Sequence, residues 1–332
     1  MSHYPHYAAA FRKFLAELPG KRFAVVGHQR PDGDCVGSQV ALCRVLRSRG
    51  FDAVCVNPDA VPRRLKFLVG DTPFLTRDEA DHAGREAVFT DCADHDRAGG
   101  KMRGIYPQPL GCFDHHLSNS GFARHNFVDT GSAATAELLA GLFFDTGLPV
   151  DDITAQALYT GIMTDTGQFR FASTSQRVFR LAADLMARGA DPAEAGFQLY
   201  ENESPGKLKL LQHFLGSLRL ECGGKVCVGL LPEGIFAQLG ASVEDTEGLV
   251  DYARSIQGVE IGVLIEERPG VIKASLRAKH AAYRMDSIAS LFGGGGHGSA
   301  AGLNCPDTVA SFYPKLLAAL ERRIAEVGSL TP

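Results

Sequence analysis

The chain has 332 residues, of which 45% are hydrophobic and 22% are charged, as in an average globular protein. At roughly 150 residues per domain, this length predicts about two domains. The net charge of −4 excludes a global positive field that would hold a long nucleic acid duplex. No apolar run reaches the roughly 18 residues of a spanning helix, and charges interrupt the amino terminus where a signal peptide would be apolar. We therefore expect a cytoplasmic protein with no membrane partner.

Short apolar segments alternate with longer helical patterns over the first two-thirds of the chain, which indicates β-α-β units and a mostly parallel sheet. A helix with apolar residues at helical spacing runs from Val36 towards Gly50. The expected strands cover residues 23–27, 53–56, 87–90 and 111–113. Three of these strands lead directly into Asp or His residues. Because ligands bind beyond the carboxyl ends of the strands in such sheets, we expect a functional site at this edge.

A helical layer and a second, smaller α+β domain follow. Helices are predicted over residues 132–147, 151–164 and 174–189, with Asp151 and Thr174 as the N-caps of the last two. Further strands are expected at residues 225–231, 259–266 and 271–276, and a turn at residues 268–270 joins the last two. The expected organisation is an N-terminal α/β domain (1–200), a helical linker (201–218) and a C-terminal domain (219–332).

Candidate metal ligands gather on the loop after the first expected strand. His28, Asp32 and Asp34 lie within seven residues, in the segment H-Q-R-P-D-G-D. Pro31 and Gly33 can turn the backbone so that both carboxylates point into one pocket. The alternative is a solvated turn, because Asp and Gly are ordinary turn residues.

Three later segments carry further acidic and histidine residues. Asp91 follows one apolar run, and Asp114 with the adjacent His115 and His116 follows another. Asp165 ends an apolar helical pattern, where its charge opposes the helix dipole and suggests a nearby cation. Each segment also has an ordinary explanation, as a cap or turn, as a pair of surface histidines or as a helix end.

Collected, these candidate ligands comprise two imidazoles and four carboxylates. The eight cysteines are scattered without a C-x-x-C pair, so we expect them to be reduced and mostly buried. A set without thiolates suits Mn²⁺ or Mg²⁺ better than a structural zinc, and six ligands are enough for two metals. Two bridged cations activate a water and stabilise the leaving oxygen in phosphoester cleavage. The six candidates are His28, Asp32, Asp34, Asp91, His115 and Asp165.

A run of four glycines, residues 293–296, precedes His297 near the carboxyl terminus. Such a run lets backbone N–H groups approach an anion, although it can also be a flexible loop. Residues 268–285 contain five basic residues and no acidic one, which predicts a compact basic patch. Within this patch, Arg277 could grip a phosphate with two hydrogen bonds. Tyr283 could stack on a base or be an ordinary core or surface tyrosine.

Five motifs in order resemble the DHH phosphoesterase superfamily. They are H-Q-R-P-D-G-D with G-S after it, F-T-D-C-A-D, F-D-H-H-L-S-N, G-I-M-T-D-T-G-Q-F-R-F, and S-L-R-A-K followed by G-G-G-G-H. The chain is most similar to the group of bifunctional oligoribonucleases and 3′-phosphoadenosine 5′-phosphate (pAp) phosphatases (NrnA-like). Proteins of this group carry a DHH catalytic domain and a C-terminal DHH-associated domain. The motifs span residues 28–302, nearly the whole chain.

The resemblance implies a role for each candidate residue. His28 and Asp32 would hold one Mn²⁺ or Mg²⁺, and Asp91 would bridge it to a second cation. That second cation would be held by the ligands Asp34, His115 and Asp165. Asp91, Asp114 and His116 would form the catalytic group, in which Asp114 orients the site and His116 faces the scissile phosphate. The substrate would be bound by Arg277, Gly294, Gly295, Gly296 and His297.

Two positions depart from the family pattern. The family usually has Ser where Ala278 stands, and often a bulkier polar residue where Gly298 follows His297. Both departures lie outside the candidate metal site, so we expect them to affect substrate preference only.

The resemblance also implies an activity and its alternatives. The expected enzyme hydrolyses short oligoribonucleotides to mononucleotides, removes the 3′-phosphate of pAp, or does both, with a water activated by two metals in an interdomain cleft. One basic patch fits short single-stranded substrates better than long polymers, and the resemblance suggests a homodimer. The alternatives are a phosphodiesterase for linear or cyclic dinucleotides (pApA, cyclic di-AMP), a RecJ-type exonuclease, a family II pyrophosphatase and a non-catalytic nucleotide sensor.

Overall fold

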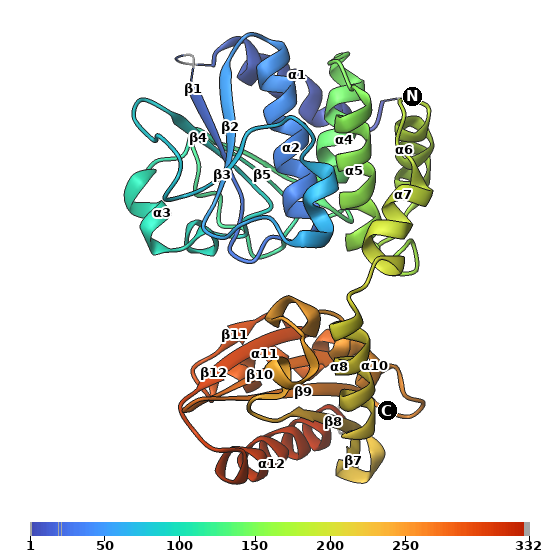
Figure 1. Cartoon of the computed structure of the whole chain (residues 1–332). Helices are drawn as coiled ribbons and strands as arrows, with labels where there is room; N and C mark the ends of the chain where they lie inside the picture. Colours follow the sequence, from blue (N-terminus) through green and yellow to red (C-terminus); the bar gives the residue numbers. More distant parts are fainter. Residues whose placement is uncertain (1, 19, 21, 329–332) are drawn as a thin grey trace. The chain divides into compact units, whose positions relative to one another are not determined.

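Figure 1 shows the computed structural model of the chain, which describes residues 2–18, 20 and 22–328. The chain divides into two compact units, Met1–Asn202 and Glu203–Pro332. The helix expected in a linker over residues 201–218 is α8 (Pro205–Gly216), and it packs against a strand of the second unit. Within the described residues, no helix combines the length and the apolar character needed to cross a membrane.

The first unit contains six parallel strands in the order β3-β2-β1-β4-β5-β6, which confirms the predicted parallel sheet. The order reverses between the neighbouring strands β1 and β4, so the topological switch point lies there. The edge strands β3 and β6 are short and only partly buried, which explains why no apolar run predicted them. The strands are β1 Arg22–Val26, β2 Asp52–Asn57, β3 Phe74–Thr76, β4 Glu86–Thr90, β5 Gly111–Asp114 and β6 His125–Val128.

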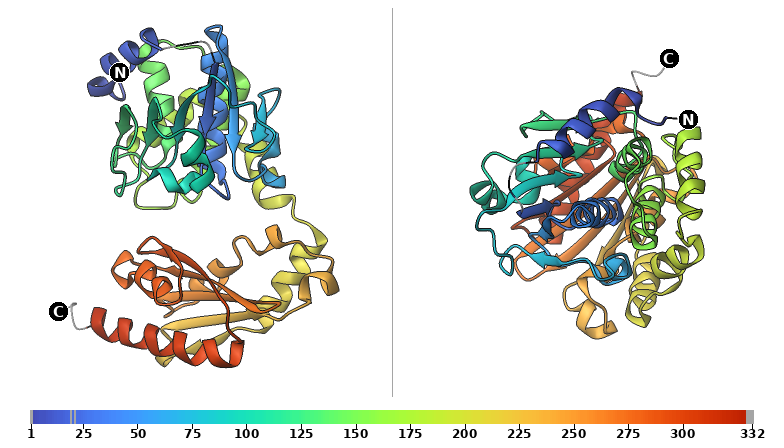
Figure 2. Two further views of the ribbon diagram at one scale, coloured as in Figure 1. Left: turned by 90° about the vertical axis from the view of Figure 1, so that its left-hand side faces the viewer. Right: turned by 90° about the horizontal axis from the view of Figure 1, so that it is seen from above.

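Helices cover both faces of this sheet (Figures 1 and 2). Alternate strand residues point to opposite faces, so Phe23 and Val25 pack in one core and Ala24 and Val26 in the other. The first core contains side chains of α1 (Pro5–Ala16), α2 (Gly33–Ser48), α4 (Thr135–Thr146), α5 (Asp152–Asp165) and α6 (Gln176–Met186). The second core contains Met102 of the short helix α3 (Gly100–Ile105).

Two glycines allow α2 and α5 to approach closely. A Cβ atom on Gly37 of α2 would lie 2.3 Å from the carbonyl oxygen of Ala157 on α5, and one on Gly161 of α5 would lie 3.3 Å from Cα of Asp34 on α2. Asp151 caps α5 as predicted, because its side chain accepts a hydrogen bond from the N–H of Thr154. The predicted cap Thr174 is wrong: α6 begins one residue later, and Ser175 accepts the hydrogen bond from Val178. Two hydroxyl residues in a row made this choice ambiguous in the sequence.

The second unit is a mixed six-stranded sheet in the order β11-β12-β10-β9-β8-β7, with only β8 and β9 parallel. The predicted hairpin is confirmed, since β9 and β10 pair antiparallel around residues 268–271. One face packs against α11 and α12, and the other against α8, α9 and α10. The strands are β7 Arg219–Glu221, β8 Val226–Leu231, β9 Ile261–Arg268, β10 Val271–Ala278, β11 Gly295–Gly296 and β12 Ala300–Cys305. The helices are α9 Ile235–Leu239, α10 Leu249–Ser255, α11 Met285–Ser290 and α12 Val309–Gly328.

Candidate active site

The candidate ligands of the first unit come together at the switch point of its sheet. His28 follows β1 and Asp91 follows β4, the two strands that flank the reversal of strand order. His115 and His116 follow β5, the next strand along. Because the carboxyl ends of parallel strands meet at one edge, side chains far apart in the sequence converge there.

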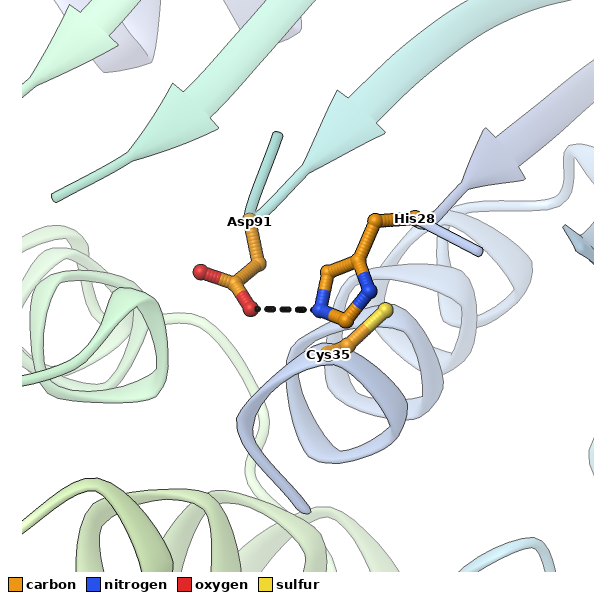
Figure 3. Close-up of side chains that lie close together, drawn as sticks. All are labelled: His28, Cys35 and Asp91. Carbon is orange, nitrogen blue, oxygen red and sulfur yellow. Dashed lines mark ion pairs between the residues drawn. The ribbon is translucent and has the colours of Figure 1, made fainter. Parts of the chain in front are cut away.

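His28 is oriented by its own loop. Its Nδ1 lies 2.8 Å from the carbonyl oxygen of Gln29, so Nδ1–H donates there and Nε2 can act as a ligand. Nε2 lies 3.3 Å from Asp91 and 3.7 Å from Asp32, and it has no hydrogen-bond partner although the side chain is 4% exposed. Figure 3 shows the His28–Asp91 pair, with the thiol of Cys35 beside the imidazole ring. A buried ring nitrogen that faces two carboxylates is the arrangement expected at a cation site.

Asp91 occupies the centre of the site in an unusual backbone conformation. Its φ angle is +57°, a region that non-glycine residues rarely adopt, although Asp and Asn tolerate it best. Its N–H donates to the carbonyl oxygen of Phe113 (2.9 Å), which keeps the loop attached to β5. The hydroxyl of Thr135 donates to its carboxylate (3.1 Å).

A second cluster lies around His115. Its Nε2 is 3.3 Å from Asp165, 3.5 Å from Asp91 and 3.9 Å from Asp34. Ligand atoms of Asp34, His115 and Asp165 lie within 4.8 Å of one another. Asp91 therefore lies between His28 on one side and His115 on the other, as a bridging carboxylate would.

Asp34 connects this cluster to the start of α4. Its carboxylate is fully buried and accepts hydrogen bonds from the N–H groups of Thr135 (2.7 Å) and Ala136 (2.8 Å). These are the first N–H groups of α4, where the helix dipole favours a negative charge. Gly161 packs closely against this carboxylate. A Cβ atom on Gly161 would lie 3.1 Å from Oδ1 of Asp34 and 2.7 Å from Cβ of Ala136.

The electrostatics of the cluster favour a cation. Burial and the charges of neighbouring carboxylates raise the pKa of Asp34 and of Asp165. Burial also opposes ionisation of Asp91, but His28, His115 and His116 hold its pKa below the ordinary value. Four carboxylates share the space with two candidate histidine ligands, so negative charge is in excess, and the residues fit one or two hard divalent cations.

His116 belongs to a hydrogen-bonded chain with Asp114 and Asn119. Its Nδ1 lies 2.7 Å from Asp114, whose other oxygen accepts a hydrogen bond from Asn119 (2.7 Å). Burial lowers the pKa of His116, but the hydrogen bond to Asp114 and the charges of Asp91 and Asp114 together outweigh it and raise the pKa above the ordinary value. Asp114 thus holds the ring in one orientation, in which Nε2 is the nitrogen that can donate to a phosphate oxygen.

Sequence reasoning missed three residues of this site. Thr135 and Asn119 orient Asp91 and Asp114, and Cys35 lies beside His28. Asn119 stands within the segment F-D-H-H-L-S-N, so its spacing from Asp114 was a usable signal. Thr135 had none, because it lies 44 residues from Asp91 and meets it only through the fold.

The candidate substrate residues of the second unit lie at one end of its sheet. Arg277 on β10 pairs in register with Ala300 on β12, which follows the turn that starts at His297. The glycine run is more ordered than a loop, since Gly295–Gly296 forms strand β11 against β12. The N–H of Gly294 donates to Ala289 (2.9 Å) and that of His297 donates to Ala300 (2.7 Å). Two of the N–H groups expected to face an anion therefore have backbone partners.

The predicted basic patch is wrong in part. Arg268 and Lys273 both contact the buried carboxylate of Glu266, at 2.6 and 2.7 Å. Arg284 pairs with Asp286 at 2.6 Å. The segment looked uncompensated in the sequence because both acidic partners lie just outside it. Tyr283 packs partly buried against the core of the second unit, so the ordinary explanation fits it.

Comparison with known proteins agrees with this organisation. The N-terminal domain model of the DHH family matches residues 22–162, and the DHHA1 domain model matches residues 223–326. A bifunctional oligoribonuclease and PAP phosphatase, NrnA, from Thermus thermophilus is 31% identical over 92% of this chain and 91% of its own length. The chain belongs to the DHH family.

Solved structures of similar proteins extend the match to the fold of this DHH protein. An exopolyphosphatase-related protein from Bacteroides fragilis superposes with a TM-score of 0.87, at 25% identity over 96% of each chain. An exonuclease RecJ bound to manganese gives a TM-score of 0.50 at 16% identity, over 96% of this chain and 94% of that one. The likeness to RecJ concerns the fold alone.

Proposed function

We propose that this DHH protein is a metal-dependent phosphoesterase that hydrolyses short oligoribonucleotides to mononucleotides, removes the 3′-phosphate of pAp, or does both. The carrying observation is the convergence of six candidate metal ligands at the switch point, next to the hydrogen-bonded pair His116–Asp114. The Thermus thermophilus relative is named for these two activities and covers nearly the same length. RNA fragments and pAp both present a phosphoester to such a site.

The proposed ligands fall into two groups that share Asp91. His28 and Asp32 would hold one cation, and Asp34, His115 and Asp165 the other. Bound divalent cations supply a nucleophilic water and neutralise phosphate charge, and Mn²⁺ is the first choice by the hard donor set. Asp114 holds the His116 ring, and His116 donates a hydrogen bond to the phosphate as negative charge develops. Arg277 and the segment Gly294–His297 would bind the far end of the substrate.

The cellular setting belongs to the proposal too. All eight cysteines are free, and five of the eight are fully buried thiols in the first unit: Cys35, Cys43, Cys55, Cys92 and Cys112. Unpaired thiols suit a reducing compartment, which supports the cytoplasm as the place of action. The homodimer stays a prediction.

The first experiment measures Mn²⁺-dependent release of mononucleotides from 5′-labelled RNA dimers to pentamers, beside pAp and pApA. Asp91→Asn is the test variant, because Asn tolerates the positive φ at this position better than Ala. We expect the variant to lose at least about 100-fold in turnover, since it removes the shared ligand.

Asp96→Asn is the matched control, because Asp96 is an exposed carboxylate five residues away that pairs only with Arg103 among described residues. It should keep full activity. Fastest turnover on the shortest RNA supports the oligoribonuclease, whereas a preference for pApA supports the dinucleotide phosphodiesterase. Tight nucleotide binding without any hydrolysis would instead identify a sensor.

A further inference from the structure

A short 3-10 helix, η2 (His95–Ala98), follows Asp91 and is held firmly beside the candidate site. The side chain of Asp94 accepts hydrogen bonds from the N–H groups of Asp96 (2.8 Å) and Arg97 (3.0 Å). The ring of His95 stacks on Phe122, with ring centres 5.3 Å apart. These contacts fix the position of η2 against the sheet.

The backbone of Arg97 connects η2 to the loop of His28. Its carbonyl oxygen accepts a hydrogen bond from the N–H of Gln29 at 2.8 Å. Gln29 in turn provides the carbonyl that orients His28. Arg97 is thus anchored through its main chain to the metal-binding loop, and its side chain starts from a fixed point.

The guanidinium of Arg97 has no recorded counter-charge among the described residues. Its Nε is buried without a hydrogen-bond partner, and no carboxylate of the described chain lies within ion-pair distance. Arg103 of the next helix, α3, contrasts with it, because its guanidinium pairs with Asp96 of η2 at 3.1 Å. The charge of Arg97 also acts on His116, where it opposes the effect of Asp114 on the imidazole.

A half-buried cation without a counter-charge costs free energy, which an anionic ligand would offset. An arginine presents a planar fork that matches two oxygens of a phosphate. The main chain of Arg97 lies against the His28 loop, within the same strand-end site as His116, which is the residue expected to face the scissile phosphate. The anion that would complete the pocket is therefore a phosphate group of the substrate.

We propose that Arg97 binds non-bridging oxygens of the scissile phosphate beside His116, as a substrate-binding residue supplied by the first unit. This inference rests on the proposed phosphoesterase function. It adds a phosphate ligand that the sequence motifs did not single out, and it predicts that the phosphate is held on two sides, by the metal ligand cluster and by η2.

The test compares Arg97→Gln and Arg97→Lys in the full-length chain, with Mn²⁺ and a labelled RNA dimer. We expect Arg97→Gln to lower kcat/KM about 100-fold, because a donor aimed at developing charge is lost. Arg97→Lys keeps the charge but loses the fork, so it should recover part of this loss. The Mn²⁺ dissociation constant, measured by calorimetry, should stay unchanged because Arg97 is not a ligand.

Arg103→Gln is the matched control, since Arg103 is an exposed arginine whose contact is with Asp96. A second measurement titrates inorganic phosphate into the Mn²⁺-loaded protein. Wild type and Arg103→Gln should bind it, and Arg97→Gln should bind it at least about 10-fold more weakly. This readout holds even if no RNA or nucleotide is hydrolysed, which separates failure of this inference from failure of the proposed function.

Two results would overturn the inference. Arg97→Gln could keep phosphate binding and turnover close to those of wild type, which would leave the guanidinium without a role in the site. Alternatively, both Arg97 variants could lose Mn²⁺ affinity and thermal stability together, which would make Arg97 a structural residue of the His28 loop.

Discussion

Asp91 combines several features that each cost folding free energy. It is buried, its backbone has a positive φ, and its charge acts on three neighbouring carboxylates, those of Asp32, Asp34 and Asp165. Such strain costs of order 1 kcal/mol or more and persists only where surrounding contacts determine it. Here the hydrogen bonds from Thr135 and to Phe113 do so. A bound cation would offset the repulsion among the carboxylates, and the surrounding hydrogen bonds hold the strained backbone that places Asp91 there.

Asp151 is a residue whose charge serves stability. Partial burial raises its pKa, but hydrogen bonds from Arg44 and Thr154 outweigh this and lower the pKa to about 2 from 3.8. A lowered pKa means that the ionised form stabilises the fold at neutral pH. This stabilisation is complete above pH 3.8 and is lost as the pH falls towards 2.

We therefore expect Asp151→Asn to lower the free energy of unfolding by about 1 kcal/mol at neutral pH, since Asn still caps the helix and the ion pair is half-exposed. The difference from wild type should shrink as the pH falls below about 4. Urea unfolding at several pH values, followed by circular dichroism because the chain has no Trp, measures this. A difference that does not depend on pH would show that the charge is unimportant.

At the scale of elements, the start of α4 supports the site from behind. Ser132 and Ala133 precede this helix, and the carbonyl oxygen of Ser132 lies 3.4 Å from Nδ1 of His115. The buried carboxylate of Glu137 accepts hydrogen bonds from Ala133 and from Arg177 of α6, both at 2.6 Å. The Arg177 guanidinium also lies 4.3 Å from the ring centre of Tyr4. Three elements distant in sequence thus hold the segment behind His115.

Removing Arg177 should leave Glu137 as a buried carboxylate without its ion-pair partner, with only the hydrogen bond from Ala133. We expect Arg177→Met to destabilise the protein by about 3 kcal/mol. The double variant Arg177→Met with Glu137→Gln should recover a large part of this loss, because the neutral amide can still accept from Ala133. Urea unfolding of both variants tests it. Equal losses in the two variants would instead assign the effect to packing of Arg177 on Tyr4.

At the scale of the whole molecule, each unit closes its own cores. All described core residues of the first unit lie before Asn202, and those of the second unit lie after it. All six candidate metal ligands belong to the first unit, whereas Arg277 and His297 belong to the second. The candidate metal ligands are therefore separable from Arg277 and His297 by where the chain is cut.

A chain ending at Asn202 should fold and bind Mn²⁺ within about three-fold of the full-length affinity, because a unit with its own cores can fold alone. It should not hydrolyse the RNA dimer, since the proposed contacts to the far end of the substrate are missing. Calorimetry and the hydrolysis assay test the two halves of this prediction. Loss of Mn²⁺ binding in a folded fragment would contradict it.

Much of this organisation was predictable from local sequence. Short apolar runs mark strands with both faces buried, and helical spacing marks helices with one buried face. The strands before His28 and Asp91 and the strand ending at Asp114 could therefore be placed within a residue or two. The six candidate ligands stand at strand or helix ends, where spacing and residue type suffice to select them. The edge strands β3 and β6 escaped prediction because they are short and only partly buried.

Only the tertiary structure decided which charges meet. Glu266 pairs with Lys273 across the hairpin as well as with Arg268 on its own strand, whereas Arg97 has no recorded carboxylate partner among the described residues. In the sequence all of these are equally plausible surface charges. The sequence by itself determined the alternation of strands and helices and the chemistry at their ends, because those depend on near neighbours. Pairing between charges depends on distances through space, which the packing of distant segments sets.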